Sequence, residues 1–230
     1  MENSIVRKCE TTIRDLINHT VSNIDKDKLH KENRTFLSKI TERLHFEKQT
    51  DWSVLTSCLD VIGDSELAIF EYHNLFELDR TTNRINANYL SLYGVLSAVY
   101  IQYTSILKLI DLFKIKNLKE IKKNIDKLDI IKLRHKVAAH PFDTSENGNK
   151  ESYKIDRNSF QANGNFRLLN SNNDFFTFNV LNSYIFYKKE IIKILYDIID
   201  KLMFYVFGNN KSEIYNKFHN RIVTLKANIN

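Results

Sequence analysis

The chain has few of the residues that break helices or form cross-links. Its 230 residues include five glycines and one proline, so we expect few tight turns and mostly long helices. The two cysteines, Cys9 and Cys58, lie far apart and lack a CxxC spacing. This spacing argues against a structural zinc site or a disulfide framework and favours buried thiols.

The chain also lacks a long uninterrupted apolar segment. The stretch MENSIVRKCE has no apolar core of the length that a secretory signal needs, so we expect a cytoplasmic protein. The most apolar stretch, residues 89–113, is interrupted by Gln102, Lys108 and Asp111. We therefore predict a buried helix there and no membrane span.

Negative charge is in the minority. Lys and Arg number 34 against 28 Asp and Glu, which gives a net charge of +6. Hydrophobic residues make up 43% of the chain, as is typical of a globular protein large enough to bury a core. A basic balance favours anionic partners, nucleic acid above all. The chain is rich in Lys, Asn and Ile together, however, and the base composition of a genome can produce this bias without selection for binding.

Apolar residues recur at helical spacing over most of the chain. Asp64 and Ser65 are predicted to cap one helix, Gly208 to end another, and Pro141 to stop a third. The predicted helices cover residues 4–21, about 27–47, 66–78, about 86–113, 117–125, 128–139, 183–207 and 212–227.

The hydrophobic period changes between residues 152 and 181. The stretches ESYKIDRNSF, GNFRLL and FFTFNVL are aromatic and β-branched, and ANG and NSNND separate them. We predict a mainly α fold, a helical bundle with a small β-hairpin or β-meander insertion at about 152–181. The chain is expected to form a single domain over 1–230, with the helices of 1–60 as an N-terminal extension.

Four tyrosines follow one stripe of the longest predicted helix: Tyr89, Tyr93, Tyr100 and Tyr103. Such a stripe is apolar yet offers hydroxyl groups. Core packing or a self-association seam is the first interpretation, and a surface on which bases stack is the alternative.

The stretch LRHKVAAHPF places Arg134, His135 and His140 at the end of a predicted helix. Arginine stays charged and presents a planar fork that matches phosphate oxygens. Histidine transfers protons near neutral pH, which cleavage of RNA by its own 2′-hydroxyl requires. Neither a metal nor a cofactor is expected to take part. In a regular helix Arg134 and His140 would lie about 120° apart, and the competing interpretation is a capped helix end with solvated side chains.

Lysines surround this stretch. Lys127, Lys132 and Lys136 are the candidate RNA-binding residues, since clustered cations guide a polyanion. A solvated helix face is the competing interpretation for most of them.

The segment RHKVAAH resembles the signature of the HEPN superfamily, in which an arginine and a polar residue precede a histidine. Arg134, His135 and His140 match these positions, and the helix before them is similar to the one that precedes the motif in bacterial HEPN-like proteins. The resemblance covers about residues 60–140 and the helix after 182. It implies a helical domain that forms a homodimer, with the motif arginine and histidine, Arg134 and His140, of both subunits in one cleft.

This resemblance implies a metal-independent endoribonuclease in a toxin, abortive-infection or other antiviral defence setting. RNA is then the substrate, an antitoxin or regulatory protein is a further partner, and no membrane is involved. The alternative function is a catalytically inactive dimeric HEPN-like module that binds a protein or a nucleotide.

Overall fold

A computed structural model describes residues 4–78, 85–139, 144–146, 149–161 and 164–227 of the chain. The chain divides into two compact units. Unit 1 comprises Met1–Gly63, Thr104–Leu118 and Ile191–Asn230, and unit 2 comprises Asp64–Tyr103 and Lys119–Glu190. The described residues are mainly helical, as the sequence predicts, while the expectation of a single domain stays a prediction.

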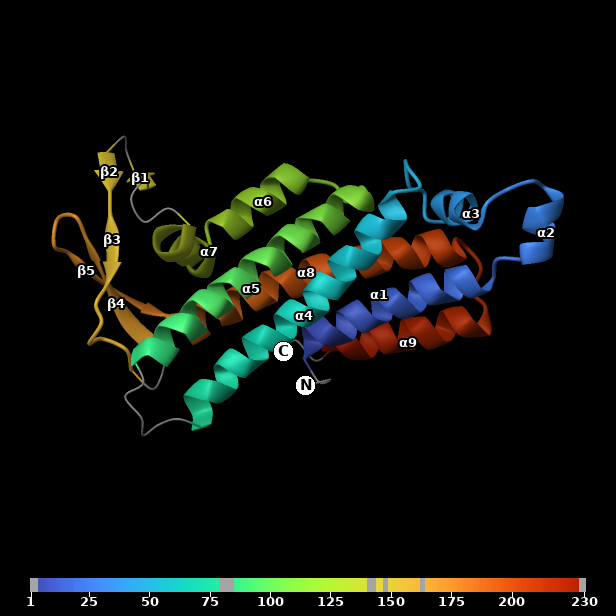
Figure 1. Cartoon of the computed structure of the whole chain (residues 1–230). Coiled ribbons are helices and arrows are strands. Elements are labelled where there is room, and N and C mark those ends of the chain that lie inside the picture. The colour runs from blue at the N-terminus through green and yellow to red at the C-terminus, as the bar shows by residue number, and fades with distance from the viewer. Residues whose placement is uncertain (1–3, 79–84, 140–143, 147–148, 162–163, 228–230) are drawn as a thin grey trace. The chain divides into compact units, whose positions relative to one another are not determined.

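Unit 1 is a helical assembly (Figure 1). Its elements are α1 (Ile5–Ser22), α2 (Lys26–Lys31), α3 (Phe36–Arg43), α9 (Glu213–Ala227) and parts of α4 (Asp51–Leu78), α5 (Ile85–Leu112) and α8 (Val180–Phe207).

Polar contacts join the helices of unit 1 around an apolar core. Ser4 caps α1 by accepting a hydrogen bond from the Arg7 backbone N–H at 3.1 Å. The Tyr196 hydroxyl of α8 donates to the Leu225 carbonyl of α9 at 2.8 Å, and Arg221 of α9 pairs with Asp15 of α1 at 2.5 Å. These contacts fix α9 beside both α8 and α1.

Unit 2 combines helices with two small sheets. Its helices are α6 (Leu118–Asp126), α7 (Asp129–Arg134), the π-helical turn η1 (His135–Ala139) and the remaining parts of α4, α5 and α8. Its strands are β1 (Thr144–Glu146), β2 (Asn149–Glu151), β3 (Tyr153–Ile155), β4 (Asn165–Asn170) and β5 (Phe175–Asn179).

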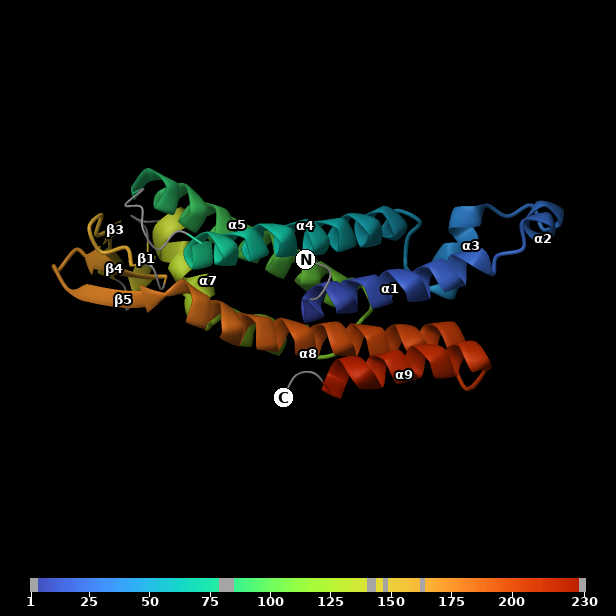
Figure 2. The same cartoon turned by 90° about the horizontal axis from the view of Figure 1, so that it is seen from below.

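The three later strands form an antiparallel meander in the order β3-β4-β5. Tyr153 pairs with Asn170, and Leu168 pairs with Phe176. This sheet confirms the predicted β-meander. The strand β5 passes into α8 without an intervening residue (Figure 2), and the Asn179 side chain caps the helix by accepting from the Asn182 N–H at 2.7 Å.

Two details of the predicted helices are wrong. Asp64 and Ser65 do not cap a helix but lie inside α4, where Ser65 is buried. The segment 27–47 forms two short helices, α2 and α3, and no continuous one. Gly208 does end α8, with a positive φ of 54° that an L-residue rarely adopts.

A buried polar cluster links three helices of unit 2. The Glu66 carboxylate, only 6% exposed, accepts hydrogen bonds from the Gln102 amide and the Tyr184 hydroxyl, each at 3.1 Å. The Tyr187 hydroxyl contacts the Gln102 side-chain oxygen and the Val99 carbonyl, each at 3.2 Å. These bonds satisfy polar groups that would be costly to bury alone.

The helix α5 contains the most apolar part of the chain. By length and composition, Tyr89–Leu112 is the one segment among the described residues that is apolar enough to cross a membrane. Its side chains at Leu92, Val95, Leu96 and Val99 are nonetheless buried. In all, 44% of this window is buried, so α5 is a partly buried helix, which agrees in part with the buried helix that the sequence predicts.

Candidate nucleic-acid interface

The motif stretch begins where α7 becomes the π-helical turn η1. Asp129 in the first turn and Arg134 in the last complement the helix dipole, and Ile130, Ile131 and Leu133 are buried and anchor α7. In a regular helix Arg134 and His140 would lie about 120° apart. Because the α-helical geometry gives way to the π-helical turn at His135, this angle does not apply. His140 lies outside the described residues.

Arg134 and His135 meet the same aromatic ring. The Arg134 guanidinium lies over the ring of Tyr100, 3.6 Å from its centroid. The His135 ring meets Tyr100 edge-on, with centroids 6.1 Å apart and an interplanar angle of 83°. Both side chains are half-buried, so Tyr100 orients them without removing them from solvent.

Lys136 has a structural partner. Its ammonium donates to the Tyr153 hydroxyl at 2.9 Å and lies 4.3 Å from the centroid of the same ring. The Tyr153 hydroxyl in turn donates to Glu151. This network ties η1 to strand β3, so Lys136 has a positioning role in addition to the charge predicted from the sequence.

The other candidate lysines face solvent. Lys132 lies on α7 and Lys127 lies between α6 and α7, and both are exposed. Their charges are therefore accessible to a polyanion, as the prediction requires.

The tyrosine stripe changes character along α5. Tyr93 is 40% exposed, Tyr89 and Tyr100 are half-buried, and Tyr103 is only 2% exposed. The Tyr103 hydroxyl donates to Asp126 at 2.7 Å, and burial, followed by this bond, raises the Tyr103 pKa. The stripe thus contributes a core residue at one end and an exposed ring nearer the other.

A cleft of about 350 Å³ lies beside the motif. We call it the α5–β3 cleft, and its lining residues are Tyr89, Tyr93, Val137, Tyr153, Lys154, Ile155 and Arg157. Sequence reasoning missed Lys154 and Arg157 in this role. In the sequence, Lys154 and Arg157 stand out only because they alternate with apolar residues of the predicted meander. This alternation does not reveal which surface they face.

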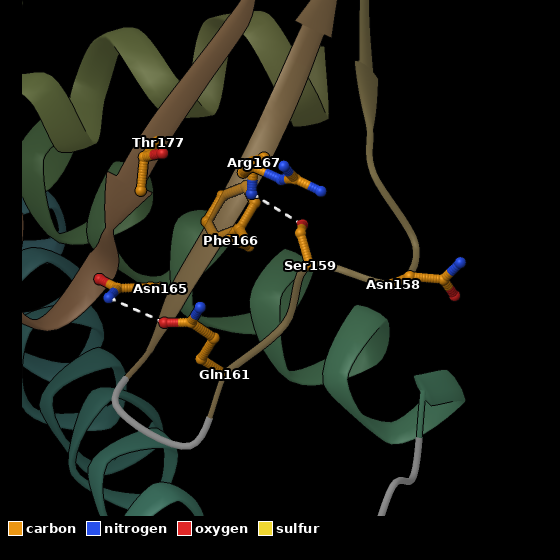
Figure 3. A pocket seen from close by; sticks show the side chains of 7 residues that line it. All are labelled: Asn158, Ser159, Gln161, Asn165, Phe166, Arg167 and Thr177. Carbon is orange, nitrogen blue, oxygen red and sulfur yellow. Dashed lines mark hydrogen bonds between the residues drawn. The ribbon is translucent and has the colours of Figure 1, made fainter.

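A second hollow, of about 330 Å³, is lined by residues of β4, of β5 and of the segment after β3 (Figure 3). Its polar groups bond to one another. The Ser159 hydroxyl accepts from the Arg167 N–H at 2.8 Å, and the Asn165 amide donates to the Gln161 side-chain oxygen at 3.1 Å (Figure 3). The Arg167 guanidinium also pairs with Asp156 at 2.6 Å. These groups stabilise the segment that follows β3. Because they already bond to one another, the hollow is a weaker candidate ligand site than the α5–β3 cleft.

Among the residues that the structure describes, no group of three or more His, Cys, Asp or Glu side chains is arranged to hold a metal ion.

Comparison of the chain with family models, with curated proteins and with solved structures finds no match. The HEPN interpretation therefore depends on the motif residues themselves.

Proposed function

We propose that the protein is a metal-independent endoribonuclease of HEPN type that acts in a toxin, abortive-infection or other antiviral defence setting. One observation carries the proposal. The half-exposed Arg134 guanidinium is held over the Tyr100 ring at 3.6 Å, directly before the π-helical turn. A planar fork that is already oriented suits two phosphate oxygens, and π-helical turns are frequent at functional sites.

In the proposed reaction Arg134 binds the scissile phosphate. The neutral imidazole of one His140 accepts the proton of the 2′-hydroxyl, and the 2′-oxygen attacks phosphorus. The bond from phosphorus to the 5′-oxygen breaks, and the protonated His140 of a second copy donates a proton to that oxygen. The products are a 2′,3′-cyclic phosphate and a 5′-hydroxyl, and His135 orients the phosphate.

This chemistry includes a homodimer, because each chain contributes one His140. The proposal also includes a cytoplasmic location and an antitoxin or regulatory protein that restrains cleavage. The exposed Lys127 and Lys132 support the choice of RNA as substrate, since both offer positive charge near the motif.

The test is an RNA cleavage assay in the presence of a chelator. We expect Arg134→Ala and His140→Ala each to slow cleavage at least about 100-fold, as loss of a phosphate donor or a proton-transfer group does. The control is Lys189→Ala, which removes an exposed charge on α8 and should cut at the parent rate. Parent-like rates for both motif variants would refute the site.

A second candidate function is a catalytically inactive dimeric module that binds a protein or a nucleotide. The observation that favours it is the exposed apolar surface on α5, where Leu90 is 76%, Ile101 47% and Tyr93 40% exposed. This function predicts no cleavage of any RNA and loss of partner binding in the double variant Tyr93→Ala, Tyr100→Ala. Binding that survives both changes would count against it.

A further inference from the structure

We propose that the α5–β3 cleft binds one unpaired nucleotide of single-stranded RNA next to the motif. The inference rests on the proposed function for the identity of the RNA as substrate, and it names the substrate class and the residues that hold it. Four of the seven lining residues, Lys154 and Arg157 among them, come from the β-insertion, which lies outside the part of the chain that resembles the HEPN core.

The dimensions of the cleft suit a single nucleotide. Its volume of about 350 Å³ lies at the lower end of the range for small-molecule sites. Tyr93 is 40% exposed, so its ring presents an accessible face. Tyr89 stands beside it at 6.4 Å between ring centroids, and Phe160 supports Tyr89 edge-on at 5.3 Å. The exposed ring is thus backed by two further aromatic rings.

Charge in the cleft matches a phosphate. Among the described lining residues, Lys154 and Arg157 are positive and none is negative. Burial raises the Tyr89 pKa, the neighbouring Arg157 guanidinium opposes the increase, and the charge of the Asp156 carboxylate adds to it. Arg157 is exposed, and it links the aromatic wall to the solvent-facing rim.

The cleft touches the motif stretch at one residue. Val137 belongs to η1 and lines the cleft, three positions after Arg134. Strand β3 packs against η1, and the bond from Lys136 to Tyr153 holds the two together. Figure 1 shows the meander beside α7. A nucleotide bound in the cleft is therefore a near neighbour, along the RNA strand, of the phosphate that Arg134 binds.

This combination selects an unpaired base. An aromatic face is available only to a base that is not already stacked and paired in a duplex, and such stacking tolerates every base. The cationic rim binds the backbone and has no sequence preference of its own. We therefore infer a preference for single strands with little discrimination among sequences.

The experiment measures binding by fluorescence anisotropy in the His140→Ala background, which prevents cleavage. The probes are a short fluorescein-labelled RNA single strand of mixed sequence and the same strand annealed to its complement. Tyr93→Ala should raise the Kd for the single strand about fivefold or more, whereas Tyr93→Trp should keep it within about twofold. Arg157→Ala should raise the Kd and lower the slope of log Kd against log salt by about one.

The matched controls are Tyr215→Ala and Arg34→Ala, a tyrosine and an arginine of unit 1, which should leave the Kd unchanged. Circular dichroism identifies any variant that fails to fold. Photo-cross-linking of the parent to 4-thiouridine RNA gives a readout without substitution, with adducts expected at the exposed Tyr93. The proposal is overturned by equal Kd values for parent, Tyr93→Ala and Arg157→Ala, by tighter binding of the duplex, by no binding of the single strand, or by adducts only outside the cleft.

Failure of the two proposals is distinguishable. Cleavage that depends on Arg134 while the Tyr93 and Arg157 variants bind as the parent does would reject the cleft and keep the ribonuclease. Binding that depends on Tyr93 and Arg157 in a protein that cuts no RNA would keep the cleft and reject the ribonuclease.

Discussion

The guanidinium of Arg134 lies 3.6 Å from the centroid of the Tyr100 ring. The two residues come from different helices of unit 2, α7 and α5, and their stack is half-exposed. A cation over an aromatic face in such a setting contributes about 0.5–1 kcal/mol, so the pair stabilises the motif and also sets its orientation.

The first prediction is that Arg134 and Tyr100 are energetically coupled. In a double-mutant cycle with Arg134→Ala and Tyr100→Leu, the free energy of unfolding should show a coupling of about 0.5–1 kcal/mol. Urea denaturation measures it. Tyr100→Phe is the control, because it keeps the ring and should keep the coupling. Strictly additive effects would show that the stack has no energetic weight.

The second prediction concerns the buried Glu66 carboxylate. Tyr184→Phe removes a donor from the buried Glu66 carboxylate, so we expect the free energy of unfolding to fall by about 1–3 kcal/mol. The control is Tyr215→Phe in unit 1, where the ring is half-exposed and the change should stay within about 0.5 kcal/mol. Equal effects of the two substitutions would contradict a stabilising role for the cluster.

The third prediction is a loss of stability in alkali. Burial raises the pKa of the Cys9 thiol to about 12 against a reference of 9.0, although a hydrogen bond between Cys9 and Tyr196 and the charge of Arg221 act in the opposite direction. Above pH 9 the unfolded chain therefore holds fewer protons at this group than the folded chain does, so the free energy of unfolding falls as pH rises toward 12. The loss is of order 1 kcal/mol per pH unit.

Buried tyrosines act in the same direction. Burial is the largest cause that raises the pKa values of Tyr184 and Tyr187, so their ionisation also favours the unfolded chain. Urea denaturation between pH 8 and pH 11 measures the slope, which should become less steep in Cys9→Ala. A free energy of unfolding that stays constant over this range would refute the prediction.

The fourth prediction compares two glycines with positive φ. At Gly208 (φ +54°) a Cβ would meet open space, so Gly208→Ala should cost only the backbone strain of about 1–2 kcal/mol. At Gly164 (φ +77°) a Cβ would also lie 3.1 Å from Leu181 Cγ, so Gly164→Ala should cost more. Thermal denaturation ranks the two, and a Gly164→Ala variant as stable as Gly208→Ala would contradict the close approach.

Local pattern predicted most of the helices and the meander. The apolar spacing of 86–113 predicts α5 to within one residue at each end, and Gly208 ends α8 for the reason expected. The predicted helix start at Asp64 and Ser65 is wrong because good capping residues also occur inside helices. Leu55, Leu59 and Ile62 continue the apolar face upstream, and packing of this longer face overrides the capping preference.

The site could be predicted only in part. The motif gives Arg134 and His135 directly, and the structure adds that both contact Tyr100. The α5–β3 cleft combines Tyr93 with Arg157, which are far apart in sequence and joined by no local pattern. The hairpin of β1 and β2 was also missed, because its polar residues lack the apolar alternation that marks a strand.

Because β5 joins α8 directly, the meander is connected to the first turn of α8 without a flexible loop. Asn179 ends the strand, Val180 starts the helix, and the capping bond to the Asn182 N–H stiffens the joint. A force that tilts the sheet is thus transmitted as torque to the first turn of α8 and is not absorbed by a loop. Inserting two glycines after Asn179 would uncouple the two movements.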